Sequence, residues 1–288
     1  MTNDTPPTAK LHHPGGVAEF PIVPATDGAS AIDISTLTRQ TGLTALDRGF
    51  VNTASTTSNI TFIDGDQGIL RYRGYSIEDV AKNSTFIEVA YLLIYGELPT
   101  PAELSAFDDK IRHHTLLHED LKRFFDALPH NAHPMSVLSS AVGALSTYYS
   151  DSLNVHDPEQ VELTTIRLLA KLPVIAAYAH KKSIGQAFLY PDNSLSFVDN
   201  FLRLNFGLMA EPYEVNPVLS AALDRLLILH ADHEQNASTS TVRLVGSTEA
   251  NLFASISAGI NALSGPLHGG ANEAVLGMLG DIRDSGES

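Results

Sequence analysis

Three histidines stand in one stretch near the C-terminal end of the chain, between Leu226 and Glu273. Two of them, His230 and His233, are three residues apart, so they share one face if the segment is helical, and Asn236 continues that face. The apolar run Leu226–Leu229 just before them predicts a helix that is buried as it enters this segment. Buried polar groups need partners, so we interpret this dense cluster as part of an active site rather than as a core cluster bonded to nearby carbonyls.

The third histidine, His268, has Gly265-Pro266 before it and Gly269-Gly270 after it. Gly-Pro ends the preceding helix, and the glycine pair lets backbone or ligand approach without a Cβ in the way. A helix is expected directly afterwards, and the positive end of its dipole favours the neutral imidazole. A neutral imidazole can donate a hydrogen bond to a developing oxyanion, as enolisation requires. The alternative is a turn in which this histidine only packs.

A metal site is a second interpretation of the same histidines. His230, His233 and Glu234 are of ligand type, but two histidines three apart do not have the spacing of an H-E-x-x-H zinc motif. The chain has no cysteine, which excludes disulfides, thiolate chemistry and Cys-based zinc sites. It also has no P-loop, no dinucleotide-binding glycine motif and no G-x-S-x-G elbow. We therefore expect no metal, and we disfavour kinases, common dehydrogenases and α/β-hydrolases.

Composition limits the class of partner. The 288 residues have a formal net charge of −15, which argues against nucleic acid and anionic membranes but leaves small acids open. The chain has no apolar run long enough to span a bilayer and no leader sequence after Met1. A soluble, cytoplasmic protein is the expectation.

Helix signals dominate after Tyr75. A cap followed by proline marks helix starts at Thr100, Asp157 and Asn216, and Pro134 opens a further helix. Apolar spacing predicts helices over 86–95, 119–128, 174–182, 196–206, 252–263 and 271–279. The only strong strand signal is a small hairpin over 59–72, where two β-prone runs flank a Gly-Asp-Gln-Gly turn. About ten helices against one hairpin predict a mostly α fold.

Two segments closely resemble the citrate synthase family: HADHEQNASTSTVR over 230–243 and GPLHGGANEA over 265–274. Supporting matches are ITFIDGDQGILRYRGYSI over 60–77, HPM over 133–135, SIGQAFLYP over 183–191 and EPYEVNP over 211–217. The resemblance extends from about Ala31 to the last residue. It implies a multi-helical large domain over 31–266 with a hairpin at 59–72, and the start of a small domain over 267–288. The Pro- and Gly-rich residues 1–30 are expected to be a mobile arm with a short extended piece at 19–23.

The resemblance also implies a reaction. An acyltransferase of the citrate (Si)-synthase type condenses acetyl-CoA with oxaloacetate and hydrolyses the product to citrate and CoA, in the tricarboxylic acid cycle. His268 would bond to the thioester carbonyl oxygen as the enol forms. His233 and Asn236 would hold oxaloacetate, and His230 would support this region. No metal or prosthetic group is implied, and the full-length family members are homodimers or hexamers built as trimers of dimers.

The family mechanism needs further groups: an Asp base, a second His for the ketone of oxaloacetate, and arginines for its carboxylates. All of these lie C-terminal to the His268 motif in the family, and no residue of this sequence matches them. We therefore expect an incomplete citrate synthase that is inactive alone and has poor solubility or a loose fold, because large-domain surface is uncovered.

Some relatives with the same extended N-terminal region are hexamers inhibited by NADH at a site in the large domain. Five residues fall where such a site would lie: His114, Thr115, Tyr149, Arg167 and Lys171. His113 and Ala210, however, stand where the sensitive type is expected to have Arg and Cys. Two further functions stay open: 2-methylcitrate synthase, which uses propionyl-CoA, and a non-catalytic helical binding or oligomerisation protein on the same scaffold.

Overall fold

The computed structural model describes residues 7–286, and the chain divides into two compact units between Ser76 and Ile77. The first, which we call the N-terminal unit, holds two small sheets and the short helix α1 (Leu37–Thr41). The second, the helical unit, holds every other helix of the described residues. The predicted domain boundaries at residues 31 and 267 stay predictions. The hairpin that was predicted as part of the helical domain groups with the N-terminal unit.

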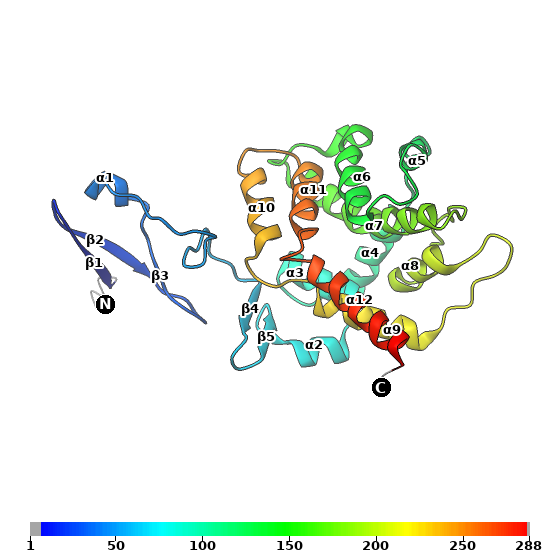
Figure 1. The fold of residues 1–288 in the computed structure, drawn as a ribbon, viewed down its shortest axis with the longest axis horizontal. Coiled ribbons are helices and arrows are strands. Elements are labelled where there is room, and N and C mark those ends of the chain that lie inside the picture. The colour runs from blue at the N-terminus through cyan, green and yellow to red at the C-terminus, as the bar shows by residue number, and fades with distance from the viewer. Residues whose placement is uncertain (1–6, 287–288) are drawn as a thin grey trace. The chain divides into compact units, whose positions relative to one another are not determined.

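The first sheet of the N-terminal unit is antiparallel in the order β1 (Thr8–His13), β2 (Gly16–Val23), β3 (Ala31–Ile32) (Figure 1). Residues 1–30 were expected to be a mobile arm, but residues 8–13 and 16–23 of it form strands. The mobility itself stays a prediction, and residues 1–6 lie outside the described part. The extended piece at 19–23 is confirmed within β2. A two-residue loop places His13 opposite Gly16, and Gly16 has a φ of 135°, which only glycine adopts readily.

The second sheet contains the predicted hairpin, with β4 (Thr61–Asp64) and β5 (Ile69–Tyr72) antiparallel and in register from Thr61↔Tyr72 to Asp64↔Ile69. A two-residue strand, β6 (Tyr75–Ser76), pairs with β5. Tyr72 is fully buried, so its ring anchors this sheet.

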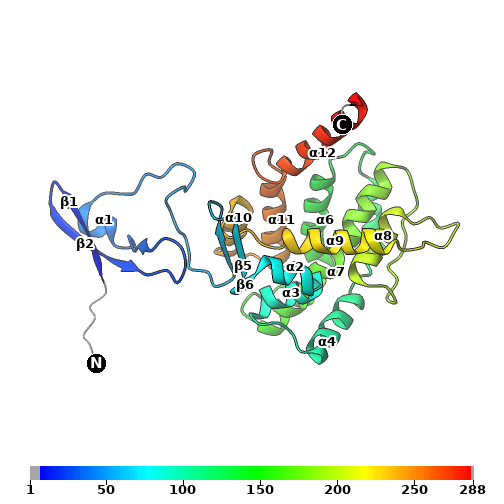
Figure 2. The ribbon, with the colours of Figure 1, turned by 90° about the horizontal axis from the view of Figure 1, so that it is seen from below.

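The described part of the helical unit, residues 77–286, contains eleven α-helices and one 3₁₀ turn, arranged as Figures 1 and 2 show. They are α2 (Ile77–Asn83), α3 (Phe86–Tyr95), α4 (Pro101–Arg112), α5 (Leu121–Asp126), α6 (Pro134–Tyr148), η1 (Ser150–Ser152), α7 (Pro158–Ser183), α8 (Phe197–Phe206), α9 (Pro217–Leu229), α10 (Ala237–Gly246), α11 (Leu252–Leu263) and α12 (Gly270–Ser285). The prediction of a mostly α fold is confirmed.

Local capping explains where several of these helices begin. Thr85 and Thr100 each form a complete capping box with the glutamate three residues later, Glu88 and Glu103. Asn216 accepts hydrogen bonds from the first turn of α9 and is followed by proline at the first helical position. The helix starts predicted at Thr100 and Asn216 are confirmed.

The long helix α7 differs from the prediction, which had one helix starting at Asp157 and a separate helix over 174–182. Pro173 lies inside one continuous helix of 26 residues. Proline removes one intrahelical hydrogen bond, and the buried residues on both sides of it, such as Ala170 and Ile175, show that tertiary packing outweighs this cost.

The main core lies between α5, α6, α7 and α11, and its largest members include Phe125, Leu145, Tyr178 and Phe253. Phe188 stacks on Tyr178 with ring centroids 4.3 Å apart. Both views show α10, α11 and α6 side by side in that order, and α11 packs on both of its neighbours (Figures 1 and 2). Among residues 7–286, no helix is long and apolar enough to cross a membrane.

Candidate active site

The segment that was expected to carry two histidines on one helical face is a break between two helices. α9 ends at Leu229, and His230 is its C-cap. Leu226 and Leu229 are exposed, and only Ile228 of α9 is buried, so the expected burial of this helix end is also wrong. The apolar run was misleading because only one of its members points into the core.

His230 and His233 nevertheless lie together. The Nδ1–H of His230 donates to the carbonyl of Leu226 at 2.8 Å, and the Nδ1–H of His233 donates to the carbonyl of Asp232 at 2.7 Å. Their rings stack with centroids 6.0 Å apart. Because each Nδ1 is occupied, Nε2 is the nitrogen that each imidazole can offer to a ligand.

Asn236 caps α10. Its Oδ1 accepts hydrogen bonds from the backbone N–H of Thr239 at 2.9 Å and from the hydroxyl of Ser238 at 2.8 Å. Glu234, two residues earlier, has a φ of 58°, a left-handed conformation that a glutamate adopts at some cost. This turn directs the chain from the end of α9 into the start of α10.

His268 lies in a tight loop between α11 and α12. The N–H of Gly269 donates to the carbonyl of Leu263 at 2.9 Å, and the N–H of Gly270 donates to that of Gly265 at 3.1 Å. A Cβ on Gly269 would lie 2.5 Å from the same Leu263 oxygen, so no other residue fits there without a shift. The predicted helix directly after His268 is confirmed as α12.

The structure brings His268 and Asn236 to one serine, Ser238, which was not among the predicted site residues. Nε2 of His268 lies 2.9 Å from the hydroxyl of Ser238 and 3.4 Å from its backbone nitrogen. If Nε2 is unprotonated, it accepts from the backbone N–H of Ser238, or from its hydroxyl when that proton is not donated to Asn236, and the ring proton is then on Nδ1. If Nε2 is protonated it donates to the hydroxyl oxygen, whose proton bonds to Asn236. A hydroxyl 30 residues away in sequence carries no local signal, which is why it was missed.

Close packing of α10 on α11 sets this distance. A Cβ on Gly259 of α11 would lie 2.5 Å from Cγ2 of Val242 and 3.6 Å from the carbonyl oxygen of Ser238. The missing side chain therefore lets the start of α10 approach the helix that leads to the His268 loop.

Among the described residues, no group of three or more His, Cys, Asp or Glu side chains is arranged to hold a metal ion. His230 and His233 lie next to each other, but they belong to no such group of three.

The five residues of the expected NADH region also lie close together. Some of the contacts are made by side chains and some by backbone carbonyls. Nζ of Lys171 donates to the carbonyls of His114 and Leu116, at 2.5 and 2.6 Å. The cations of Arg167 and Lys171 lie 4.5 and 4.9 Å from the ring centroid of Tyr149. Thr115, the fifth residue, donates its hydroxyl proton to the carbonyl of Arg112.

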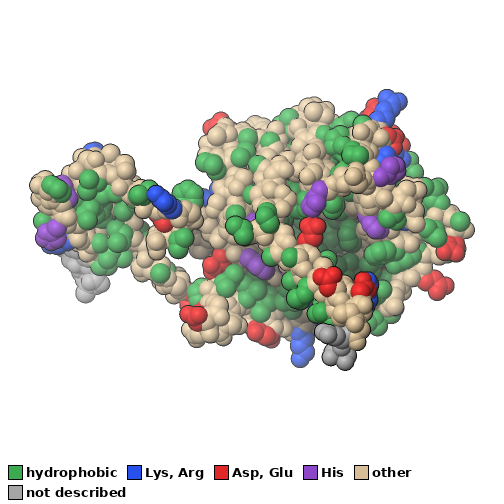
Figure 3. All heavy atoms as spheres, in the orientation of Figure 1, with side chains coloured by type: hydrophobic (Ala, Val, Ile, Leu, Met, Phe, Trp, Pro, Cys, Tyr) green, Lys and Arg blue, Asp and Glu red, His purple; other side chains and the backbone are tan. Residues whose placement is uncertain are grey.

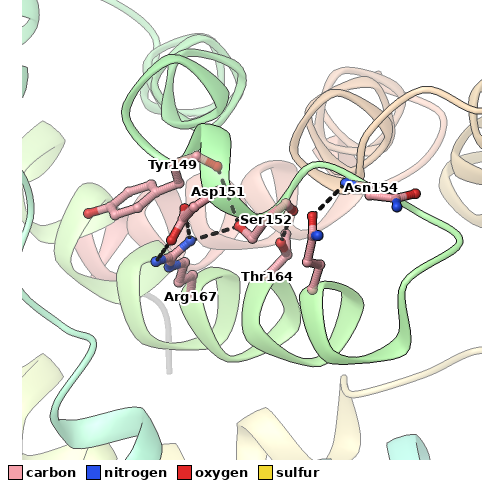
Figure 4. Close-up of polar contacts among 7 residues, drawn as sticks. Tyr149, Asp151, Ser152, Asn154, Thr164 and Arg167 are labelled. Carbon is pink, nitrogen blue, oxygen red and sulfur yellow. Dashed lines mark hydrogen bonds and ion pairs between the residues drawn. The ribbon is translucent and has the colours of Figure 1, made fainter.

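Both cations of this region already have partners. Arg167 forms a two-pronged pair with Asp151 at 2.6 and 2.9 Å and also donates to Ser152 (Figure 4). These bonds hold the pKa of Asp151 below its usual range. Lys171 is only 3% exposed, and burial, with the nearby Arg167 charge, lowers its pKa to about 8.

The class of protein follows from the fold and this site: a multi-helical protein that holds one histidine of a helix–loop–helix junction against the capped start of a neighbouring helix. The family model described as "Citrate synthase, C-terminal domain" matches residues 49–287. The chain belongs to the citrate synthase family.

Relatives and solved structures agree. The chain is 66% identical over 284 residues to Citrate synthase 1 of Mycobacterium tuberculosis, covering 99% of this chain and 66% of that protein. It is 58% identical to the citrate synthase of Corynebacterium glutamicum, and the match covers 96% of this chain and 63% of that protein. The citrate synthase structure from Pyrobaculum aerophilum matches with a TM-score of 0.71 and 33% identity. The match covers 95% of this chain and 62% of that one.

A further structure, from Thermoplasma acidophilum, matches with a TM-score of 0.77 and 27% identity, covering 83% of this chain and 61% of that one. It is a ternary complex of citrate synthase with carboxymethyl coenzyme A and oxaloacetate. The chain spans about two thirds of the length of the curated relatives it matches.

Proposed function

We propose that this chain takes part in the citrate synthase reaction, the condensation of acetyl-CoA with oxaloacetate followed by hydrolysis to citrate and CoA. The observation that carries the proposal is the convergence of Asn236 and His268 on Ser238 in a chain of this family. The ternary complex of the Thermoplasma relative contains oxaloacetate and a CoA thioether, and we assign the same two ligand classes to this chain. The proposal includes no metal or prosthetic group.

Oxaloacetate is assigned to His233 and Asn236, with His230 in support. The Oδ1 of Asn236 accepts the Thr239 N–H in the α10 cap, so its NH₂ group is the part that can donate to a carboxylate. Nε2 of His233, once protonated, can form a charge-assisted hydrogen bond to the same dianion.

The thioester is assigned to His268. When Nε2 accepts from Ser238, Nδ1–H can donate to the thioester carbonyl oxygen. Negative charge develops on that oxygen as the methyl proton leaves, so a fixed donor stabilises the enolate-like transition state more than the ground state.

Calorimetric titration tests the two assignments separately. We expect oxaloacetate to bind, and to lose roughly ten-fold or more in affinity in Asn236→Ala and His233→Ala. His268→Ala is expected to retain oxaloacetate binding and to weaken binding of carboxymethyl coenzyme A. His12→Ala, on an exposed strand of the N-terminal unit, is the matched control. Failure of the unsubstituted chain to bind oxaloacetate would contradict the proposal.

Thiol release from acetyl-CoA with oxaloacetate measures whether the chain completes the reaction by itself, and the expected inactivity stays a prediction. Propionyl-CoA in the same assay tests 2-methylcitrate synthase activity. His268→Ala with unchanged binding of both ligands would favour the non-catalytic scaffold instead.

Self-association belongs to the same proposal. Val218, Leu219 and Leu226 of α9 are between 52% and 73% exposed, and five apolar residues of α12 are exposed as well. Figure 3 shows hydrophobic side chains among polar ones on one face of the helical unit. Apolar surface of this kind is typical of subunit interfaces, and supports a homodimer or hexamer. Sedimentation velocity across a concentration series tests it.

NADH binding to the Tyr149 region is proposed only as regulation. The Arg167 cation beside the ring of Tyr149 suits a nucleotide phosphate next to a base. An incoming phosphate must displace Asp151 from Arg167, so we expect Asp151→Asn to tighten NADH binding and Arg167→Ala to abolish it, measured by NADH fluorescence.

A further inference from the structure

His133 contacts two helices at once. It precedes Pro134, the first residue of α6, and its Nδ1 accepts a hydrogen bond from the backbone N–H of Met135 at 3.3 Å. Its Nε2 lies 3.3 Å from Oε2 of Glu273, in the first turn of α12. The two side chains are 140 residues apart in sequence, so only the fold brings them together.

The bond to Met135 determines how His133 meets Glu273. A nitrogen that accepts from Met135 N–H carries the lone pair, so the proton of the neutral ring is on Nε2 and is donated to the Glu273 carboxylate. Ser, Thr, Asp and Asn are the usual residues at this capping position. Each of these side chains could accept the hydrogen bond from Met135 N–H. None of them has a ring with a second nitrogen that can donate to Glu273 at the same time. Histidine satisfies both contacts.

The loop that carries His268 is attached to α6 at both of its ends. At one end α11 packs on α6, where the hydroxyl of Ser257 donates to the carbonyl of Ser139 at 2.7 Å. At the other end α12 has no buried residue, and Glu273 bonds it to the cap of α6. The second attachment therefore adds to the orientation that the α11 side and the contact with Ser238 give to the loop.

We propose that His133 and Glu273 are positioning residues that fix the start of α12 and thereby orient His268. The proposal rests on the proposed function only for what His268 does; the attachment itself is independent of it. Both side chains are partly exposed, 46% for His133 and 72% for Glu273. The attachment is therefore weak, and its loss changes the His268 loop rather than the global fold.

Three substitutions separate the attachment from the cap. His133→Asn keeps a side-chain acceptor for Met135 but is too short to reach Glu273. Glu273→Ala removes the attachment and leaves the cap untouched. Glu273→Gln keeps an acceptor for Nε2–H without the charge, so it is the conservative rescue. Amide hydrogen exchange over 264–285 and the ring ¹⁵N spectrum of His268 are the measurements, with thermal unfolding as the control.

We expect His133→Asn and Glu273→Ala to speed amide exchange over 264–285 about three-fold. In the ring ¹⁵N spectrum of His268, we expect both tautomers to be populated in these variants. Glu273→Gln is expected to resemble the unsubstituted chain in both measurements. Unchanged exchange and spectra in the first two variants would overturn the proposal, as would faster exchange spread over the whole chain. All of this is measured without substrate, so absence of oxaloacetate binding would reject the proposed function and leave this result standing.

Discussion

Nε2 of His268 lies within hydrogen-bond distance of both the hydroxyl and the backbone nitrogen of Ser238, at 2.9 and 3.4 Å. One residue at the start of α10 therefore contacts the loop before α12 and, through its hydroxyl, Asn236. Ser238 is the partner of Nε2 in either tautomer of His268, as acceptor of its proton or as donor to its lone pair.

Ser238→Ala tests this arrangement. The backbone N–H stays, so we expect the Nδ1–H form of His268 to become dominant and the stability loss to be about 1 kcal/mol or less. Ring ¹⁵N shifts report the tautomer, and urea unfolding reports stability. Ser240→Ala is the matched control, because Ser240 accepts from Gln235 and has no hydrogen bond to His268. An unchanged His268 spectrum in Ser238→Ala would contradict the prediction.

Gly259→Ala tests the close approach of α10 and α11. Because the new Cβ meets Cγ2 of Val242 at 2.5 Å, and a β-branched side chain in a helix has few other rotamers, the helices must separate. We expect a loss of roughly 1–3 kcal/mol in the free energy of unfolding, from urea melts.

Gly280→Ala in α12 is the control for Gly259→Ala. Nothing lies within 4 Å of the added Cβ there, so the higher helix propensity of alanine should stabilise α12 by up to about 1 kcal/mol. If both substitutions had the same sign, packing at Gly259 would not be the cause.

Substitution of Asp224 tests a contact between α9 and α3. Its carboxylate accepts from the backbone N–H of Phe86 at 3.1 Å, and burial raises its pKa, with Glu88 and Asp199 nearby. A raised native pKa means that the charged form costs stability, and this cost disappears as the pH falls through that pKa.

We expect Asp224→Asn to be more stable than the unsubstituted chain at pH 7 by about 1 kcal/mol or less, and to lose that advantage in acid. Asp224→Ala leaves the Phe86 N–H without its acceptor and should lose about 1–2 kcal/mol. Urea unfolding at neutral and acidic pH measures both. An advantage of Asp224→Asn that persisted at low pH would contradict the titration argument.

The fold was predictable where neighbouring residues determine it. Thr100 with Glu103 starts α4 through contacts three residues apart, and the glycines around His268 indicate a loop whatever lies nearby. The continuity of α7 through Pro173 was not predictable, because packing by distant helices decides it. Apart from the extended piece at 19–23, the strands up to residue 32 were missed because the alternation that buries Ala18 and Phe20 lies within a Pro- and Gly-rich segment.

The roles of the selected site residues stay predictions, and their geometry was not predictable from the sequence. His268 and Asn236 were selected by their local setting and by the family resemblance. That Ser238 joins them depends on how α10 packs on α11, which no spacing within either segment encodes. The shared helical face of His230 and His233 was wrong, because the helix ends at Leu229 and the two rings meet across a turn.

Lys171 makes stability depend on pH in a window that the sequence alone does not reveal. Burial lowers its pKa from 10.5 to about 8 in the folded chain, so between these values the unfolded chain binds more protons. Stability contributed by this group therefore rises as pH increases from about 8 to 10.5, by at most about 3 kcal/mol. The carbonyls of His114 and Leu116, which accept from Nζ, oppose part of the shift.

We expect Lys171→Met to be less stable at pH 7, because two buried carbonyls lose their donor, and to lack this rise. Urea unfolding between pH 7 and 10.5, taken as the difference between the two chains, removes the titration of groups that both share. A difference that stayed constant across this range would show that Lys171 titrates alike in the folded and unfolded chains.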